Sequence, residues 1–513
     1  MRHLESAQMG KEIELKFQVP PRELRKLKAA RALHRKPSEE EDLVSVYFDT
    51  RNHKLARNDV TLRVRRHGDK FFQTIKSGGS NGSFRRGEWE HEIKGAVPNF
   101  GEAHGTPLEP LLTKKLERTL KPVFETRIHR VSVPIRKNGS RIEMALDEGE
   151  VRAGRQSAPI NEIELELKRG KAGDLFKLAR EIGKLAPATL SLKSKSERGY
   201  DLIEDAPAQA ARAEKILLRR GMTTMDAFRI IGRSVLRHIA ANEAAVRSSD
   251  SDGVHRMRVG LRRMRAAISL FSKLFGDQGT ERIKSELKWL TGELAPARDL
   301  DVYVRNEIEP LQRAAPARRG MNELAGALTS RRDAAFGRVK AAVESLRYRS
   351  LLLDTLQWLE TGNWAKRARH HQHRPIERFA AEILARRTRK AIKKAKKVRQ
   401  LDSRQRHTLR ISVKKLRYAT DFFGHLFAGH AAKKRLFDFK TRLTDLQDRL
   451  GALNDIKVHK KLALKLGRPS AKGRPQAFAV GIVSGREKGE IEPLLSAAEK
   501  DARKFAQVRS FWI

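Results

Sequence analysis

The stretch KEIELKF, residues 11–17, alternates charged and apolar side chains without a break. Successive side chains of an extended strand point to opposite faces, so the stretch predicts a strand with Glu12, Glu14 and Lys16 on one face and an apolar row on the other. The same alternation recurs in TLRVR (61–65), GEWEHEI (87–93), RIEMALDEG (141–149) and NEIELELK (161–168). The chain up to about residue 200 therefore predicts a β-rich, antiparallel domain.

The charged face of each of these strands is mostly of one sign. Glu162, Glu164 and Glu166 share a face, as do Arg63 and Arg65. Ordinary amphipathic strands with their charged side in water would explain the period. Like charges two residues apart repel on an exposed face, however, so a closed sheet with its charges inside is the second interpretation. Facing rows of carboxylates and cations suit an anionic substrate that brings a divalent metal.

Eight charged blocks follow one another in an order that resembles the CYTH superfamily, the triphosphate tunnel metalloenzymes. They are EIELK (12–16), TLRVR (61–65), QTIKS (73–77), RRGEWE (85–90), ETRIHR (125–130), ALDEG (145–149), NEIELELK (161–168) and SKSERGY (194–200). The resemblance implies an eight-stranded antiparallel β tunnel with flanking helices over residues 8–203. It also implies hydrolysis, or in some members cyclisation, of a triphosphate compound with Mg²⁺ or Mn²⁺.

The same resemblance assigns roles to individual residues. The implied metal ligands are Glu12, Glu14, Asp147, Glu162, Glu164 and Glu166. The implied phosphate ligands are Lys16, Arg63, Arg65, Lys76, Arg86, Arg127, Arg130, Lys193, Lys195 and Arg198. The residues with an implied catalytic part are Lys16, Glu88, Glu90 and Glu125.

The general base is left open by one departure from the family pattern. Some members have a lysine just before the TR of the fifth block, and Phe124 and Glu125 stand at those places here. Glu125 is a candidate base, and a salt-bridge partner is its alternative.

The second part of the chain differs in both period and charge. Residues 1–205 hold 41 of the 108 basic and 31 of the 62 acidic residues, which leaves a net charge of +36 for the remainder. Apolar residues three and four apart replace the alternation and predict helices. We expect a linker over 204–215 and an all-α domain over 216–505 that binds a polyanion.

An internal repeat organises the helical part. HRMRVGLRRMRAAISLF (255–271) superposes on HTLRISVKKLRYATDFF (407–423), and LAPARDLDVYV (294–304) on LGALNDIKVHK (450–460). The repeat predicts two pseudo-symmetric helical bundles, at about 220–345 and 375–500.

Each copy of the repeat carries a basic stripe at helical spacing. His255, Arg258, Arg262 and Arg265 stand at intervals that recur as His407, Arg410, Lys414 and Arg417. A solvated charged face is the alternative for one such helix, but solvation alone does not require the spacing to recur. The pattern resembles the CHAD domain, a conserved histidine α-helical domain, and implies binding of inorganic polyphosphate by these eight residues with their neighbours Arg263 and Lys415. Together the two resemblances are those of bacterial inorganic triphosphatases that fuse CYTH to CHAD.

Several other functions stay open from the sequence. They are a thiamine triphosphatase, a class IV adenylate cyclase, a non-catalytic polyphosphate-binding scaffold and a nucleic-acid-binding protein. Only 6% of residues are aromatic, which disfavours base stacking. The basic stretch RRTRKAIKKAKKVR (386–399) is interpreted as a helix that flanks a polyphosphate site, with RNA or DNA as its alternative.

Composition bounds the location and the chemistry. The absence of cysteine excludes disulfides, thiolate zinc sites and a cysteine nucleophile. The N-terminal residues lack a signal-peptide pattern and no apolar run predicts a membrane span, so we expect a cytoplasmic protein, with polyphosphate granules as a further location. The sequence predicts no membrane partner and leaves the oligomeric state open.

Overall fold

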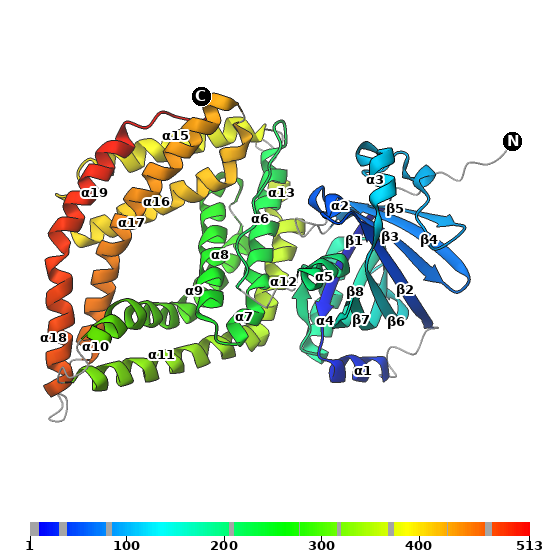
Figure 1. Cartoon of the computed structure of the whole chain (residues 1–513), viewed down its shortest axis with the longest axis horizontal. Helices are drawn as coiled ribbons and strands as arrows, with labels where there is room; N and C mark the ends of the chain where they lie inside the picture. Colours follow the sequence, from blue (N-terminus) through cyan, green and yellow to red (C-terminus); the bar gives the residue numbers. More distant parts are fainter. Residues whose placement is uncertain are drawn as a thin grey trace. The chain divides into compact units, whose positions relative to one another are not determined.

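The computed structural model describes residues 10–29, 38–77, 85–204, 210–275, 277–314, 320–367, 374–427, 429–466 and 474–513. The chain divides into two compact units (Figure 1). The first comprises Met1–Gln209 with Glu344–Thr361, and the second Ala210–Val343 with Gly362–Ile513. One helix from within the predicted helical domain, α12 (Leu346–Thr361), therefore belongs to the β-rich unit.

The first unit is built on one closed antiparallel sheet. Its strands are β1 (Gly10–Gln18), β2 (Glu39–Asp49), β3 (Val60–His67), β4 (Lys70–Ser77), β5 (Arg85–Ile93), β6 (Lys121–Lys137), β7 (Ser140–Ala153), β8 (Gln156–Arg169) and β9 (Thr189–Ser191). The order is β5-β4-β3-β2-β6-β7-β8-β1-β9, and pairing of β1 with β5 closes the ring of eight long strands. The predicted fold class is confirmed, with β9 as an addition that is too short to show a period.

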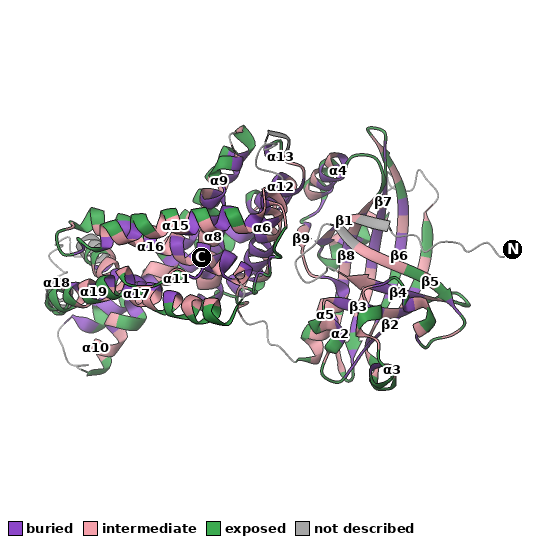
Figure 2. Ribbon diagram, turned by 90° about the horizontal axis from the view of Figure 1, so that it is seen from above, coloured by how far each residue is buried: buried purple, intermediate pink, exposed green. Residues whose placement is uncertain are grey.

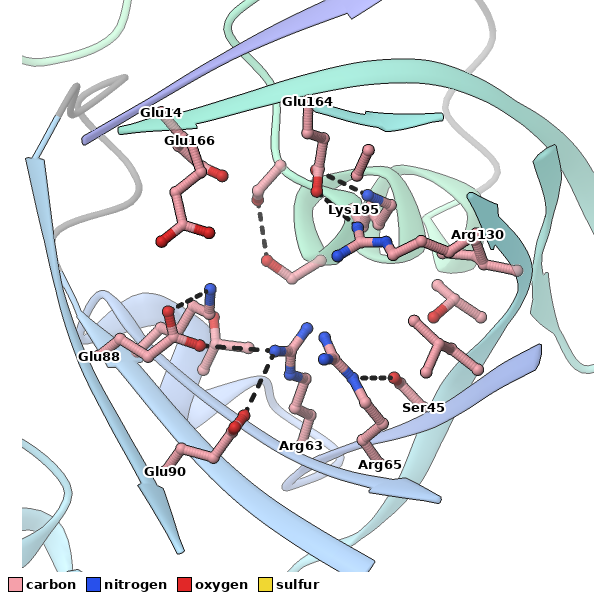
Figure 3. A pocket seen from close by; sticks show the side chains of 18 of the residues that line it. Glu14, Ser45, Arg63, Arg65, Glu88, Glu90, Arg130, Glu164, Glu166 and Lys195 are labelled. Carbon is pink, nitrogen blue, oxygen red and sulfur yellow. Dashed lines mark hydrogen bonds and ion pairs between the residues drawn. The ribbon is translucent and has the colours of Figure 1, made fainter. Parts of the chain in front are cut away.

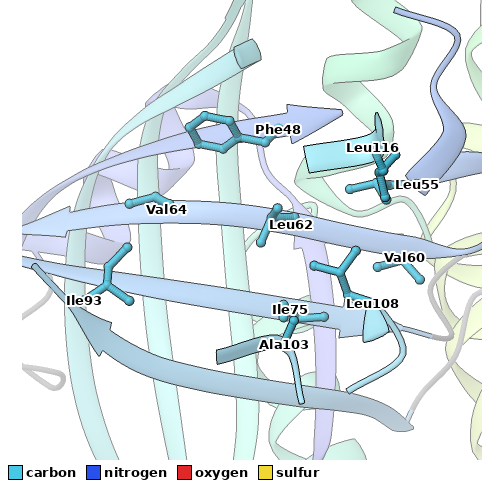
Figure 4. Packing of buried hydrophobic residues seen from close by; sticks show 10 residues of the cluster. All are labelled: Phe48, Leu55, Val60, Leu62, Val64, Ile75, Ile93, Ala103, Leu108 and Leu116. Atoms are coloured by element: carbon cyan, nitrogen blue, oxygen red, sulfur yellow. The ribbon is translucent and has the colours of Figure 1, made fainter. Parts of the chain in front are cut away.

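Closure places the charged rows inside and the apolar rows outside. Leu62 and Val64 of β3 and Ile75 of β4 point outward into a buried cluster. The segment that covers this cluster contains η1 (Phe100–Ala103), η2 (Glu109–Leu111) and α3 (Lys114–Thr119). Figure 4 shows Ala103, Leu108 and Leu116 of this segment beside the side chains of the strands, and burial alternates along the strands (Figure 2). The apolar core of this wall therefore lies outside the ring.

Three helices cover other parts of the ring's outer face. They are α1 (Pro21–Ala29), the short α2 (Lys54–Arg57) and α4 (Ala172–Leu185). Helix α4 packs on β1 and β8, and α12 packs on α4 and β9. The Arg180 guanidinium donates to Asp354 at 2.8 Å, which joins α4 to α12.

Helix α5 (Lys195–Ile203) packs inside the ring instead. Ser194 caps it in a capping box with Glu197. The helix contacts β6, β7 and β8, and its Tyr200 hydroxyl donates to Asp49 Oδ2 at 2.8 Å. Tyr200 also meets the ring of Phe124, which stacks on Tyr47. Helix α5 thus fills one end of the closed sheet and brings its first turn to the inner surface.

The second unit is all-helical and follows the predicted repeat. The first repeat holds α6 (Thr224–Ala241), α7 (Glu243–Arg247), α8 (Ser251–Leu270), η3 (Ser272–Leu274), α9 (Gln278–Tyr303), η4 (Val304–Ile308), α10 (Glu309–Ala314) and α11 (Met321–Glu344). After α13 (Trp364–Arg367), the second holds α15 (Ile376–Ala395), α16 (Ser403–Phe423), η5 (Gly424–Leu426), α17 (His430–Leu466), α18 (Arg474–Gly489) and α19 (Ile491–Ala506). The repeats meet where α8 contacts α16 and α6 contacts α15. Over the described part of the chain, no helix is long and apolar enough to cross a membrane.

The predicted linker, 204–215, is not free along its described length. Its residues 205–209 lie outside the described residues. The Ala211 carbonyl lies 3.1 Å from His238 Nε2 and accepts from Asn242 Nδ2 at 3.1 Å, while Glu214 pairs with Arg237 at 3.0 Å. Residues from 210 onward are therefore part of the helical unit, because α6 supplies polar groups that hold them.

Replacing Gly199 by alanine tests how tightly α5 is packed in the ring. A Cβ at Gly199 would lie 2.3 Å from the Phe124 ring. Alanine alone favours a helix by up to about 1 kcal/mol, but overpacking costs about 1–3 kcal/mol, so we expect Gly199→Ala to lower the stability of the first unit. Gly183→Ala in α4, where a Cβ meets nothing within 4 Å, is the matched control and should be neutral or stabilising. Chemical denaturation of both variants measures this, and equal stabilities would contradict the packing of α5.

Candidate functional site

The inward rows of the closed sheet line a cavity of about 730 Å³. Its cationic lining residues are Lys16, Arg63, Arg65, Lys76, Arg130, Lys168 and Lys195. Its acidic lining residues are Glu14, Asp59, Glu88, Glu90, Glu92, Glu143, Glu164 and Glu166. In Figure 3 the labelled Glu14, Glu166, Glu88 and Glu90 gather on one side, while the arginines point toward one another on the other. Charged side chains therefore make up most of the described lining, and the cavity is polarised across its width.

Three arginines form the positive side of the cavity. Arg65 donates from Nε to Ser45 Oγ at 3.4 Å, and no acidic side chain among the described residues forms an ion pair with it. Burial lowers the pKa of Arg65 to about 10, and the charges of Arg63 and Arg130 add to the effect. A buried guanidinium beside two others, with no carboxylate in contact, is a preformed site for an anion.

A network of buried ion pairs holds the neighbouring cations in place. Lys195 Nζ lies 2.7 Å from Asp147 Oδ2 and 2.7 Å from Glu164 Oε1. Arg130 Nη2 lies 2.7 Å from Asp147 and 2.6 Å from Glu164. Burial raises the pKa of Glu164, but the cations of Lys16, Lys195 and Arg130 outweigh it and bring the pKa well below its usual value. Both carboxylates therefore stay ionised and fix the directions of Lys195 and Arg130.

The opposite wall carries a second set of ion pairs. Glu88 lies 2.9 Å from Lys76 Nζ and 3.5 Å from Arg63 Nη2. Glu90 accepts from Thr74 Oγ1 at 2.8 Å. Burial raises the pKa of Glu90, but the Arg63 charge and this hydrogen bond lower it overall. Glu88 and Glu90 thus hold basic groups of the cavity in place.

Tyr47 is a cavity residue that the sequence analysis missed. It lines the cavity and is 4% exposed. Burial raises the pKa of its hydroxyl, but the nearby charges of Arg63, Lys195 and Arg65 outweigh this and leave the pKa below 10. The sequence could have indicated this, because residues two apart on a strand share a face: Tyr47 and Ser45 of β2 both face inward.

A row of carboxylates crosses three strands of the ring. Glu14 of β1 is in register with Glu166 of β8, and Glu166 with Glu143 of β7. Carboxylates directly opposite one another repel unless a cation lies between them. Lys16 Nζ lies 3.1 Å from Glu14 Oε1, an oxygen that is buried without a hydrogen bond, and Lys168 bridges Glu143 and Glu166.

The donor chemistry of this row fits a divalent cation. Carboxylate oxygens are the ligands that Mg²⁺ and Mn²⁺ prefer. As arranged here, however, no three acidic or histidine side chains of the described residues converge into a metal site. A cation at the row would compete with Lys16 and Lys168. The side chains of Glu12 and Arg86, both predicted site residues, lie outside the described part.

Two predicted tunnel residues on β6 face away from the cavity. Arg127 donates from Nε to Glu125 Oε1 at 2.8 Å, and its side chain is 54% exposed. Thr126, Ile128 and Arg130 are the residues of this strand that line the cavity. Successive side chains of a strand point to opposite faces, so Glu125 and Arg127 lie on the face opposite the cavity. Their interpretation as cavity residues is wrong.

Four other predicted residues lie near the cavity but do not line it. Asp147 and Glu162 are fully buried and contact cations instead of open space. Arg198 lies 3.3 Å from Glu162, and Lys193 pairs with Asp201 near the surface. Asp147 and Glu162 therefore support basic groups, in place of the metal contact expected of them.

The second unit holds a separate groove of about 740 Å³ between the two repeats. Eight predicted residues line it: His255, Arg258, Arg262, Arg265, His407, Arg410, Lys414 and Lys415. Five polar residues that the analysis did not assign line it too: Arg298, Asp299, Asn454, Asp455 and His459. All five stand in the second repeated block, and its recurring RD and ND pairs, which hold four of them, were the available signal.

The remaining two predicted polyphosphate ligands lie outside the groove. Arg263 lies over the Phe422 ring at 5.5 Å and Arg417 over Tyr418 at 5.4 Å. Their repeat counterparts, Lys415 and Arg265, do line the groove, so the helical phase alone does not decide this difference. These two residues are corrected to a packing role.

Burial and like charge alter the ionisation of the groove. Burial lowers the pKa of His255 to about 4, and the charges of Arg298 and Arg262 act in the same direction. Burial lowers the pKa of Lys414 to about 7, reinforced by Arg410 and Arg262. His255 is therefore neutral near pH 7, and Lys414 titrates close to that pH.

Comparison with known proteins identifies a family for each of the two parts of the chain. A CYTH domain model matches residues 10–200 and a CHAD domain model matches residues 231–464. The chain is 33% identical over 162 residues to an inorganic triphosphatase of Haemophilus influenzae, a match that spans 31% of this chain and 45% of that protein. The crystal structure of the CHAD domain from the plant Ricinus communis is 26% identical and superposes with a TM-score of 0.51 over 59% of this chain and 98% of that one.

Arg65 and Arg127 give a matched test of the cavity, because both are arginines of the same sheet with opposite directions. We expect Arg65→Ala to weaken the binding of inorganic triphosphate in the cavity by about tenfold, since one charge-assisted contact is lost. Arg127→Ala should bind as the wild type does. Titration calorimetry without metal measures both, and equal affinities for the two variants would contradict the inward assignment.

Proposed function

Because the chain consists of a CYTH domain followed by a CHAD domain, we propose that it hydrolyses inorganic triphosphate in the first unit and binds inorganic polyphosphate in the second. The observation that carries the first part is the cluster of Arg63, Arg65 and Arg130, in which Arg65 contacts no acidic side chain of the described residues. The observation that carries the second is the single groove lined by basic stripes from both repeats.

The cavity binds the phosphate chain by charge. Arg63, Arg65 and Arg130 face its oxygens from one side, with Lys76 and Lys195 beside them. Their positions are set before the substrate arrives, because carboxylates already hold four of the five. Preorganised charges of this kind stabilise the charge that spreads over the phosphate oxygens during transfer.

In the reaction, a water oxygen attacks the terminal phosphorus in line with the bridging oxygen. The new P–O bond forms as the bridging P–O bond breaks, so orthophosphate and pyrophosphate are the products. Cations along the arginine side stabilise the leaving pyrophosphate. A divalent cation held by Glu14, Glu143 and Glu166 would supply further neutralisation of the phosphates when bound.

Tyr47 is our proposed acceptor for the proton of the attacking water. It lines the cavity, and its pKa is lowered by the neighbouring cations. A lower pKa raises the share of phenolate near neutral pH, and the proton then leaves with the orthophosphate. This assignment replaces Glu125, which faces away from the cavity.

An inorganic substrate fits the lining better than a substrate with an organic group. Of the described residues that line the cavity, fifteen carry a charged side chain and two, Tyr47 and Phe72, are aromatic. Thiamine or a nucleoside would need an apolar or stacking surface. Thiamine triphosphatase and adenylate cyclase activities are therefore the weaker alternatives.

The groove of the second unit binds phosphate chains by several charges at once. Arg258 lies 3.4 Å from Asp299, and His407 Nδ1 lies 2.8 Å from Asn454 Oδ1, so carboxylate and amide groups orient the basic side chains. Two repeats supply equivalent groups to one groove, and a linear repeating anion has equivalent oxygens to offer. Such binding is expected to weaken steeply with salt.

Phosphate release from inorganic triphosphate tests the first part of this function. We expect turnover with Mg²⁺ or Mn²⁺, and slower turnover with ATP and thiamine triphosphate. Tyr47→Phe removes the proton acceptor and should lower kcat about 10²–10⁴-fold and shift the alkaline dependence of the rate. No turnover by the folded wild type would favour the non-catalytic scaffold, and an unchanged pH profile of Tyr47→Phe would contradict its role.

The pH dependence of polyphosphate binding tests the groove. With the pKa of Lys414 at about 7 in the free groove, the side chain is charged below pH 7 and loses its proton above it. An anion favours the charged form, so affinity should fall as the pH rises from 7 to 9, by at most about tenfold per unit for one proton. Lys414→Arg keeps the charge and should flatten the profile. A wild-type affinity that stays constant over this range would contradict the assignment.

A further inference from the structure

A cluster of cations adjoins the groove at α15 and has no equivalent beside α6 among the described residues. Arg265 of α8 and Lys415 of α16 line the groove, and Arg387 and Lys390 of α15 lie beside them. We propose that these four residues form a second phosphate-binding segment, which binds the polyphosphate chain where it leaves the groove. We call these residues the α15 segment. This inference rests on the proposed polyphosphate binding.

Ser269 at the end of α8 lies at the centre of this segment. Its Oγ accepts from Lys415 Nζ at 3.3 Å and from Arg387 Nη2 at 3.4 Å. Its carbonyl also accepts from Arg387 Nη2, at 3.2 Å. Arg387 Nε is buried and makes no hydrogen bond. Two cationic side chains thus converge on one hydroxyl and retain capacity to donate to an anion.

No counter-charge compensates the four cations. Among the described residues, no carboxylate forms an ion pair with any of them, whereas Arg258 in the groove has Asp299 at 3.4 Å. Burial lowers the pKa of Lys415, and the charges of Arg387, Arg265 and Lys390 lower it further. Like charges held close together repel one another, which is unfavourable. A bound anion would relieve this repulsion, and the relief would add to its binding free energy.

The equivalent place in the other repeat is closed to an anion. Backbone pairing of Thr224 with Arg374 and of Ile376 with Met222 sets the equivalence of α6 and α15, in which Arg387 matches Val235 and Lys390 matches His238. Both matched residues are buried, and Ala211 lies over His238. The repeat that relates His255 to His407 also places Asp421 where Ser269 stands.

Asp421 neutralises that equivalent place. It lies 3.3 Å from Lys440 and its charge acts on Arg263, the counterpart of Lys415. The same replacement explains why Arg263 and Arg417 pack against aromatic rings instead of lining the groove. The two ends of the groove therefore differ, and a chain that is longer than the groove gains contacts only at the α15 end.

Basic residues continue along α15 beyond the four. Arg386 and Lys393 are exposed on the same side of the helix as Lys390. Aromatic side chains are absent from the described groups that form the segment, so it offers charge without a stacking surface. A polyphosphate chain, which has charge and no bases, matches this chemistry better than RNA does.

The test compares the double variant Arg387→Gln, Lys390→Gln with the control Arg389→Gln, Lys396→Gln. The control removes the same charge from exposed positions roughly 160–180° round the helix from Arg387. Affinity is measured by competition titration of the full chain with long-chain polyphosphate, tripolyphosphate and a single-stranded RNA, at several salt concentrations.

We expect the double variant to lose about tenfold in affinity for long-chain polyphosphate and at most about twofold for tripolyphosphate, while the control stays within twofold of wild type for both. The salt dependence for the long chain should become shallower by about 1.4, by analogy with two lost contacts to a single nucleic-acid strand.

The other outcomes separate this inference from the proposed function. A wild type that binds no polyphosphate overturns the function of the groove and this inference with it. A wild type that binds, with a double variant equal to the control, overturns the α15 segment alone. Equal losses for long and short chains make the four residues part of the groove, and a larger loss for RNA makes a nucleic acid the occupant; either result overturns the inference.

Discussion

The ion pairs of Lys195 with Asp147 and Glu164 are the contacts on which the first unit depends. They join the first turn of α5 to the inner face of β7 and β8. Charges buried to this depth are strongly unfavourable alone and persist only in mutual contact with good geometry. Because each carboxylate also contacts Arg130, a shift of one side chain would leave another buried charge unpaired. The network therefore fixes the helix, the strand wall and the positive side of the cavity together.

This constraint explains the inverted arrangement of the sheet. A small closed sheet normally fills its interior with apolar side chains. Here the interior holds the charged cavity beside the apolar cluster around α5, so the outward apolar rows need covers on the outside, and η1, η2, α3 and α4 provide them. Stability and function thus use opposite faces of the same strands. A substitution such as Leu62→Ala would affect folding first, and one at Arg63 would affect the cavity first.

The sequence predicted the closed sheet and most of the cavity because charged and apolar residues alternate along each strand, which assigns each residue to one face. It failed where phase or context decided the outcome. On β6 the TR pair led to the prediction that Arg127 lines the cavity, but Arg127 faces outward and Arg130 faces inward. Tyr47 carries no charge and therefore left no mark in the pattern. In the helical unit, spacing by three and four identified the groove face, but Arg263 and Arg417 pack on aromatic rings although their repeat counterparts Lys415 and Arg265 line the groove. Burial by Ala211 and neutralisation by Asp421 depend on residues far apart in sequence, so no local pattern could have shown them.

The position of α12 has a consequence for how this chain arose and how it comes apart. The polypeptide leaves the first unit before residue 210, returns for residues 344–361, and leaves again. The two units are therefore interlaced along the chain, and the helix that joins the two repeats has been recruited by the β-rich unit. A recombination event or a proteolytic cut at the linker alone would not separate them cleanly, since the first unit would still be tethered through α12. Because the chain passes between the two units more than once, the two units are inherited and degraded together.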